Sequence, residues 1–204
     1  NLGKALLGIE SLAPCLVLID EIDQLLQRGS NGDSGVQQRL FARMLDFMSN
    51  PQNRGRIVFV AATNRPDLMD PALKRPGRFD RKIPFLLPGW AERVAILQAV
   101  HRRYGMAGEP DWEEAARRTE GYTGAELEAV VLKAWELAED AGRNEITNAD
   151  LEGALERIRP STAEVQFMTD LAILECDDKD VLPPEFRDLL DDRKALEERV
   201  QRYK

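Results

Sequence analysis

A short apolar run that ends in carboxylates constrains the fold of this chain more than any other feature. Residues 15–19 read Cys-Leu-Val-Leu-Ile, follow Pro14, and lead directly into Asp20 and Glu21. An uninterrupted apolar run bounded by a proline is typical of a strand buried on both faces, as in a parallel sheet. In open α/β sheets, ligands bind at the carboxyl ends of the strands. The run therefore predicts a buried strand that delivers Asp20 and Glu21 to a ligand-binding edge.

The paired acids admit two interpretations at this point. In one, Asp20 holds Mg²⁺, usually through water, and Glu21 polarises the water that attacks a γ-phosphate, which is the layout of a Walker B element. In the other, the acids cap the helix that follows the strand.

A second buried strand is predicted for residues 56–62, which read Arg-Ile-Val-Phe-Val-Ala-Ala. Asn64 follows it, and an asparagine at a strand end either hydrogen-bonds a water and a phosphate oxygen or simply forms a turn. A short helix is predicted for residues 70–75, with an aspartate cap and a proline at its first position. A third short strand is predicted for residues 82–87.

Two arginines flank a turn in this region. Arg75 and Arg78 lie three residues apart around Pro76 and Gly77, so their guanidinium groups are expected to project from a rigid corner. The guanidinium fork is planar and permanently charged, which suits it to phosphate recognition. A surface salt-bridge cluster with Asp80 is the alternative.

The remaining pattern is helical. Four helices after an α/β segment indicate a small helical domain that begins near Trp90. We therefore predict an α/β domain over residues 1–89, a helical domain over 90–158 and a helical extension over 159–204. Helices are predicted for residues 1–12, 22–26, 36–49, 91–104, 111–119, 123–142, 147–158, 162–175 and 184–204, two of them opening with capping boxes at Thr123 and Thr147.

Composition limits the functional classes. A net charge of -8 argues against global attraction to nucleic acid or to an anionic membrane. No apolar stretch is long enough to span a bilayer. Two distant cysteines, Cys15 and Cys176, suit reduced cytosolic thiols rather than a disulfide scaffold. His101 is the single histidine, which excludes a multi-histidine metal site within the chain.

In their order and spacing, three motifs strongly resemble those of the AAA ATPases. They are the strand ending in Asp20-Glu21, the strand followed by Thr-Asn-Arg-Pro at 63–66, and the run Asp-Pro-Ala-Leu-Lys-Arg-Pro-Gly-Arg-Phe-Asp-Arg at 70–81. The resemblance is to the AAA family proper, which includes valosin-containing protein, FtsH and the proteasomal ATPases. It covers residues 1–158 and is most specific over 61–81, the family's second region of homology. It implies an α/β fold, a P-loop NTPase (AAA+) parallel sheet followed by an all-helical lid.

The resemblance also implies roles by position in the α/β part. Asp20 and Glu21 would be the Walker B pair, with Asp20 at the Mg²⁺, and Asn64 would be sensor 1, aligning the attacking water with the γ-phosphate. Arg75 and Arg78 would be arginine fingers that reach the nucleotide of a neighbouring subunit.

Further positions match the lid and the channel of the family. Gly124 and Ala125 match the lid turn that lies against the adenine, and Ile96 matches a further adenine contact. Residues 27–36 match the second pore loop. His101 lies one position after the family's usual histidine, so we do not assign it to the base and expect a partly exposed helix histidine.

One family motif is missing. The chain contains no G-x-x-x-x-G-K-[ST] phosphate loop, because Gly3-Lys4-Ala5 lacks the preceding glycine and the following hydroxyl. The first pore loop is missing too, and in family order both precede Asn1, so we expect a fragment: the later half of the α/β domain with the whole lid. The family's phosphate-loop strand lies between strands 56–62 and 82–87. The chain is therefore expected to fill that gap by self-association or sheet rearrangement, or to leave those strands poorly ordered.

The leading hypothesis is an ATP-hydrolysing module of a ring-forming, hexameric, cytoplasmic machine that uses ATP and Mg²⁺ and draws a polypeptide through a central pore. The fragment itself is expected to be inactive, because the lysine and backbone cradle for the phosphates are missing. The alternative is a catalytically inactive AAA-like assembly or regulatory module. DNA-clamp loading or helicase work fits less well, because the Arg-Pro-Gly-Arg-Phe-Asp run is not typical of those relatives. A fused zinc protease is unsupported, because residues 162–204 contain no histidine.

Overall fold

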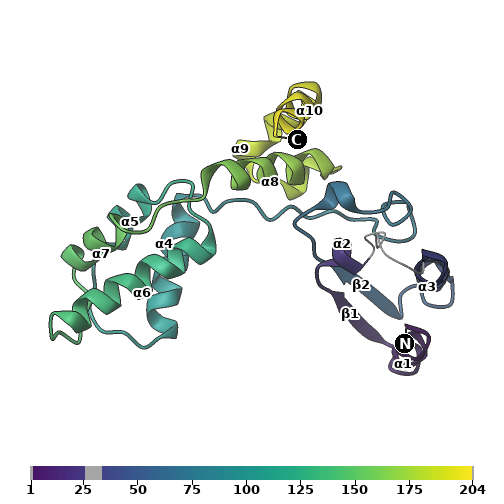
Figure 1. Cartoon of the computed structure of the whole chain (residues 1–204), viewed down its shortest axis with the longest axis horizontal. Coiled ribbons are helices and arrows are strands. Elements are labelled where there is room, and N and C mark those ends of the chain that lie inside the picture. Colours follow the sequence, from purple (N-terminus) through teal and green to yellow (C-terminus); the bar gives the residue numbers. More distant parts are fainter. Residues whose placement is uncertain (1, 26–33, 204) are drawn as a thin grey trace. The chain divides into compact units, whose positions relative to one another are not determined.

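The computed structural model describes residues 2–25 and 34–203, which divide into two compact units (Figure 1). The first unit combines residues 1–84 with 170–204, and the second comprises residues 85–169. The domain limits predicted at 89/90 and 158/159 remain predictions. The first unit is considered below before the second.

A two-stranded parallel sheet forms the centre of the first unit. The strands are β1 (Cys15–Ile19) and β2 (Ile57–Ala61), paired in register from Cys15 opposite Ile57 to Ile19 opposite Ala61. Both strands lie where the sequence predicted them. Burial on both faces was wrong, however, because alternate residues of each strand are exposed.

One face of this sheet is covered by helices and by a small apolar cluster. The helices are α1 (Leu2–Ser11), α2 (Ile22–Leu25) and α3 (Ser34–Ser49). The buried members of the cluster are Ile22, Met44, Met48 and Leu73, against which Ile19, Phe41, Leu45, Phe59, Ala61 and Phe79 pack, among others. Since Leu73 and Phe79 belong to the arginine-bearing run 70–81, the same cluster fixes that run to the strands.

Two predictions for residues 70–87 were wrong. Residues 71–74 form turns rather than a helix, in which Asp70 Oδ1 accepts the Ala72 N–H at 2.8 Å and the chain bends back until the Phe79 N–H donates to Leu73 O. Residues 82–87 form no strand. A strand needs a hydrogen-bonding neighbour, and in the described residues β1 and β2 bond only to each other. One 3₁₀ turn, η1 (Pro66–Leu68), lies between β2 and the run.

The C-terminal part of the first unit is helical but interrupted. It comprises the end of α8 (Thr162–Glu175), η2 (Lys179–Val181), α9 (Pro184–Arg187), η3 (Asp188–Leu190) and α10 (Arg193–Arg202). The single helix predicted over 184–204 was therefore wrong. Asp192 starts a new helix instead, because its carboxylate accepts the Ala195 N–H at 3.1 Å.

The second unit is a four-helix domain built on α4 (Trp90–Arg103), α5 (Trp112–Arg118), α6 (Gly124–Asp140) and α7 (Asn148–Leu155). Its buried core draws on all four helices and includes Leu97, Ala116, Leu127, Val130, Val131, Ala134, Leu151 and Ala154. Both predicted capping boxes are present, at Thr123 with Glu126 and at Thr147 with Asp150. The all-helical character predicted for this part is confirmed.

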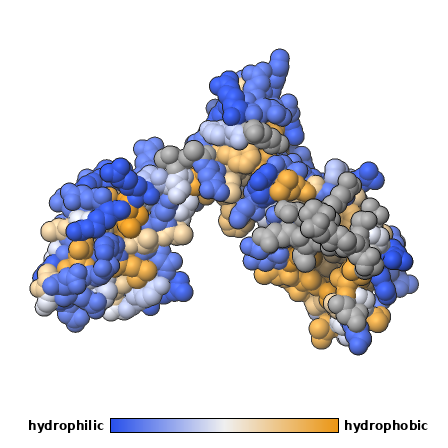
Figure 2. Space-filling model, in the orientation of Figure 1, coloured by the Kyte–Doolittle hydropathy of each residue, from blue (hydrophilic) through white to orange (hydrophobic). Residues whose placement is uncertain are grey.

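One face of the β1–β2 sheet carries apolar side chains in contact with solvent. Leu16 and Leu18 are 64% and 66% exposed, and Val58 and Val60 are 53% and 41% exposed. Figure 2 shows apolar side chains gathered on the part of this unit that holds the two strands. A contiguous exposed apolar surface of this kind indicates an interface or an aggregation site.

We expect the 204-residue chain to self-associate through this sheet face. Leu18→Glu should weaken the association about ten-fold or more, because burying a leucine side chain contributes about 1.5–3 kcal/mol. Sedimentation velocity over a range of concentrations measures this, and Leu132→Glu, a change at an exposed leucine of α6, is the matched control. A wild-type chain that stays monomeric at every concentration contradicts the expectation.

The start of α7 predicts a pH dependence of stability. The bidentate ion pair with Arg143, at 2.6 and 2.7 Å, holds the pKa of the nearly buried Asp150 carboxyl well below its usual range, and hydrogen bonds from Thr147 act in the same direction. A depressed folded-state pKa stabilises the fold above the unfolded value of about 3.9, and this contribution is lost as the pH falls below it.

Asp150→Asn should therefore lower the free energy of unfolding by about 1–3 kcal/mol at pH 7. Urea unfolding at a series of pH values measures this, and the difference from wild type should shrink as the pH falls below about 4. Glu152→Gln is the control on the same helix, because the Glu152 side chain is 66% exposed and its pairing distance to Arg118 is 3.7 Å. A difference that is constant with pH would show that the carboxylate charge is not involved.

Candidate functional site

The carboxyl ends of β1 and β2 leave the sheet side by side. Beyond the ladder, the Ala62 N–H donates to Ile19 O at 2.9 Å and the Ile22 N–H donates to Ala62 O at 3.1 Å. The Asp20-Glu21 pair lies between these two bonds, and Asn64 follows two residues after Ala62. Backbone pairing thus brings the two predicted acids and the predicted asparagine to one sheet edge, where all three are exposed.

The acid pair has an unusual backbone. Glu21 has φ +50°, in the left-handed region that side-chain-bearing residues rarely adopt, at a cost of roughly 1–2 kcal/mol. Its N–H donates to Asp20 Oδ1 at 2.9 Å, while Asp20 Oδ2 has no hydrogen-bond partner within residues 2–25 and 34–203. Backbone strain of this kind concentrates at functional sites. The turn therefore leaves carboxylate oxygens available at the edge.

A side-chain bridge that sequence reasoning missed joins α2, which follows these acids, to the loop after β2. The Thr63 hydroxyl donates to Asp23 Oδ1 at 2.5 Å and accepts the Arg65 N–H at 2.9 Å. Asp23 is a buried residue of α2, so this partly buried bond holds α2 to the loop after β2. The parallel pairing of two acid- and hydroxyl-bearing strand ends was the signal from which the bridge could have been inferred.

The two predicted finger arginines differ in their surroundings. The Arg78 guanidinium donates to Ala72 O at 2.6 Å and to Ser49 Oγ at 3.1 Å, so it braces its own turn. Arg75 is exposed, and nothing in the part of the chain that the structure describes hydrogen-bonds or ion-pairs with it. Asp80 accepts the Gly77 N–H instead of pairing with either arginine, so the alternative of a salt-bridge cluster is not what forms here.

The predicted adenine contacts belong to the second unit. Ile96 is partly buried on α4, and Gly124 and Ala125 are the exposed first residues of α6. His101, at the end of α4, is partly buried, with its ring 5.1 Å from that of Trp112. The predicted second pore loop, residues 27–36, lies almost wholly outside the described residues.

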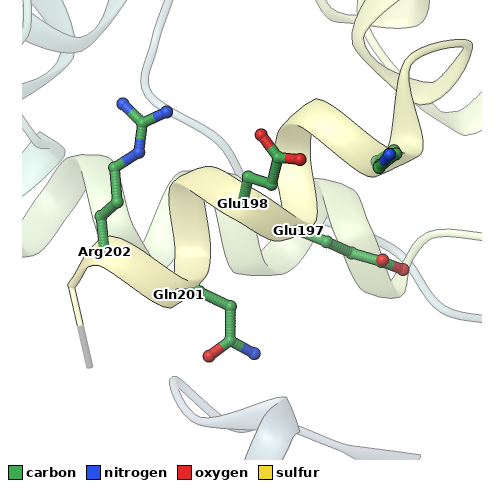
Figure 3. A pocket seen from close by; sticks show the side chains of 5 residues that line it. Glu197, Glu198, Gln201 and Arg202 are labelled. Carbon is green, nitrogen blue, oxygen red and sulfur yellow. The ribbon is translucent and has the colours of Figure 1, made fainter.

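Surface hollows lie away from this edge. One runs along α10 and is lined by Lys194, Glu197, Glu198, Gln201 and Arg202 (Figure 3). The labelled side chains point away from one another along a single helix, so this hollow lacks the converging polar groups of a ligand-binding site. Another, between α1 and α3, is lined by Leu6, Leu7, Glu10, Arg43, Asp46, Phe47 and Asn50.

The residues at the edge suit a hydrated divalent cation. Carboxylate and amide oxygens are the ligands that Mg²⁺ prefers, and it keeps several of its waters. Asp20, with one unengaged carboxylate oxygen, fits that demand, and the exposed Glu21 and Asn64 fit contacts to water. No group of three or more His, Cys, Asp or Glu side chains within the described ranges is arranged to hold a metal by itself. Any cation here therefore relies on further ligands such as water or phosphate.

Comparison with known proteins identifies the family of the chain. Residues 1–87 match the family model described as ATPase family associated with various cellular activities (AAA), and residues 109–153 match that of the AAA+ lid domain. The chain belongs to the AAA family. The α/β fold with a helical lid that the resemblance implied is thereby confirmed.

Several curated relatives are about 40% identical to this AAA chain over the aligned residues. It is 39% identical over 166 residues to the cell division cycle protein 48 homolog of Archaeoglobus fulgidus, an alignment that covers 74% of this chain and 23% of the relative. It is 41% identical over 152 residues to an ATP-dependent zinc metalloprotease FTSH, chloroplastic, of Nicotiana tabacum. This alignment covers 73% of the chain and 21% of the relative. It is 40% identical over 150 residues to the ATP-dependent zinc metalloprotease FtsH of Acidothermus cellulolyticus, an alignment that covers 72% of this chain and 22% of the relative. The AAA chain thus spans between a fifth and a quarter of the length of these relatives.

Arg78→Ala should destabilise the first unit by about 1–3 kcal/mol, because it removes hydrogen bonds from a charged donor to Ala72 O and Ser49 Oγ. Arg75→Ala should change the unfolding free energy by less than about 0.5 kcal/mol, as for an ordinary surface site. Urea denaturation of both variants beside wild type measures the contrast. Equal losses in the two variants would show that Arg78 does not brace the turn.

Proposed function

We propose that this AAA chain is the later half of an ATP-hydrolysing domain together with its lid, and that it works in a ring-forming, hexameric machine that remodels or unfolds polypeptides. The observation that carries this proposal is the meeting of Asp20, Glu21 and Asn64 at one edge of a parallel sheet. Acids and an amide at such an edge are what the hydrolysis of a bound nucleotide requires, and family membership supplies the nucleotide class.

Each residue at the edge has a distinct task in this proposal. Asp20 would hold Mg²⁺, usually through water, and Glu21 would accept a hydrogen bond from the attacking water and so polarise it. Asn64 orients that water and the terminal phosphate by donating and accepting hydrogen bonds. When bound, Mg²⁺ neutralises charge on the phosphates.

The remaining site residues act on other parts of the nucleotide. Arg75 serves as the finger toward a neighbouring subunit, which its exposure and its lack of partners in the described chain support. Arg78 is proposed for the same task, and its bonds to Ala72 O and Ser49 Oγ would have to be exchanged for contacts with phosphate. Ile96, Gly124 and Ala125 are proposed to contact the adenine.

Partners and location follow the same reasoning. A polypeptide that passes through a central pore is the proposed substrate, and the net charge of -8 gives no support to a nucleic-acid partner. No helix in the described part of the chain is long and apolar enough to cross a membrane. Cys15 and Cys176 are both free thiols, which suits the reducing cytoplasm proposed here, although the relatives include chloroplast proteins. The zinc protease activity in the names of the FtsH relatives is not carried over, since this chain has a single histidine.

A non-catalytic assembly or regulatory module is the second candidate. A phosphate loop encoded before Asn1 would favour the enzyme, and its absence there would favour the module. Against it, such a module has no chemical need for Asp20, Glu21, Asn64, Arg75 and Arg78 together.

One experiment separates these two candidates. The 204-residue chain alone is expected to release no phosphate from ATP, because it lacks the loop that grips the phosphates. A chimera that joins the preceding AAA segment of the Archaeoglobus fulgidus relative to Asn1 should hydrolyse ATP, and Glu21→Gln should lower its kcat by at least about 100-fold while ATP still binds. A folded, ATP-binding chimera without hydrolysis would favour the non-catalytic module.

A further inference from the structure

The C-terminal segment contacts the arginine-bearing run directly. Lys74 Nζ lies 2.7 Å from Glu175 Oε1, and Lys82 Nζ lies 2.5 Å from Asp177 Oδ2. All four residues belong to the first unit. The segment 170–204 falls outside the two ranges that the family models match, so neither model assigns it a role.

The two segments in contact, residues 74–82 and residues 175–180, have opposite charge. Residues 74–82 carry five cationic side chains and one aspartate, whereas residues 175–180 carry four acids and one lysine. Lys74 and Lys82 lie at the two ends of residues 74–82, immediately before Arg75 and immediately after Arg81. Residues 175–180, called the acidic turn below, therefore contact residues 74–82 at both ends.

The acidic turn is itself firmly held. Asp170, which is wholly buried on α8, accepts two hydrogen bonds from Arg199 of α10, at 2.6 and 3.0 Å. Leu171, Ile173 and Cys176 are buried along the same stretch. Because a bidentate arginine–carboxylate pair fixes geometry as well as charge, and the Asp170 side chain in this pair is wholly buried, Glu175 and Asp177 are presented from a rigid support.

A competing interpretation is that residues 170–204 mask Arg75, but the contacts argue against it. Arg75 lies next to Lys74, yet none of the acids in the described part of the segment pairs with it, and it stays exposed. The turn engages the flanking lysines and leaves this guanidinium available to another molecule.

We propose that residues 170–204 form a positioning clamp for the arginine-bearing run: Glu175 and Asp177 hold Lys74 and Lys82 so that Arg75 is displayed in a fixed place. The clamp is a property of the structured chain, and its consequence for catalysis rests on the proposed function. Glu175 and Asp177 are positioning residues and do not touch nucleotide.

Hydrogen exchange on the intact 204-residue chain tests the clamp. The amides to follow are those of Leu73, Lys74, Gly77 and Phe79, which are hydrogen-bonded within the run. In the double variant Glu175→Gln with Asp177→Asn, these amides should exchange about five-fold faster, the scale expected when two partly exposed ion pairs are lost. Amides of β1, β2 and α6 should exchange as in wild type.

Matched controls separate the clamp from general loss of stability. Asp191→Asn with Glu197→Gln removes two acids of the same segment that pair with Lys179 and Arg193 inside it, and should leave the run unchanged. Reversing one pair, Lys82→Glu with Asp177→Lys, should restore slow exchange that either single change loses. Unchanged exchange at the four amides in the double variant, or a uniform increase throughout the first unit, would overturn the clamp.

The catalytic consequence is measured in the chimera described above. Loss of the clamp should lower kcat about five-fold while the KM for ATP stays unchanged, and the reversed pair should restore kcat. If kcat is unaffected although exchange at the run is faster, the positioning role is overturned. If the wild-type chimera does not hydrolyse ATP at all, the proposed function fails, and the exchange experiment still decides whether the clamp exists.

Discussion

The parallel register between β1 and β2 is the constraint on which the candidate site depends. Because the strands run in the same direction and pair residue for residue, the loops after Ile19 and Ala61 leave the sheet together. A slip of one strand by one residue would turn the side chains of that strand to the opposite face and break the continuation of the pairing into Ile22 and Ala62. The acids and Asn64 therefore lie at one edge of the sheet as a result of backbone hydrogen bonding.

Features that depend on neighbouring residues were predictable from the sequence. The apolar run at 15–19 marked β1 correctly because its pattern and its bounding proline are local signals. The capping boxes at Thr123 and Thr147 were equally readable, since each places an acceptor three residues before its partner. In the second unit such signals locate the four helices, whereas the packing of α4 on both α5 and α6 depends on longer-range contacts.

Features that depend on distant partners were not predictable in the same way. Residues 82–87 have the composition of a strand, but strand formation requires a neighbour, and none is found in the described chain. The helix predicted over 70–75 gave way to turns because Leu73 and Phe79 both pack on one apolar cluster, which bends the chain between them. The Asp23–Thr63 bridge joins residues 40 positions apart, so neither residue alone indicates it.

The same long-range contacts explain why Arg75 rather than Arg78 is left free in this conformation. Leu73 is wholly buried and Phe79 packs on the same cluster, so both ends of the turn are anchored by apolar burial. Gly77, at φ +88°, lets the chain reverse between them and brings Arg78 onto Ala72 O. With Lys74 and Lys82 paired to acids, Arg75 stays exposed and without a partner among the described residues, on a backbone that is already ordered. A partner that binds it meets little further cost of ordering the loop, which favours recognition by a pre-formed surface.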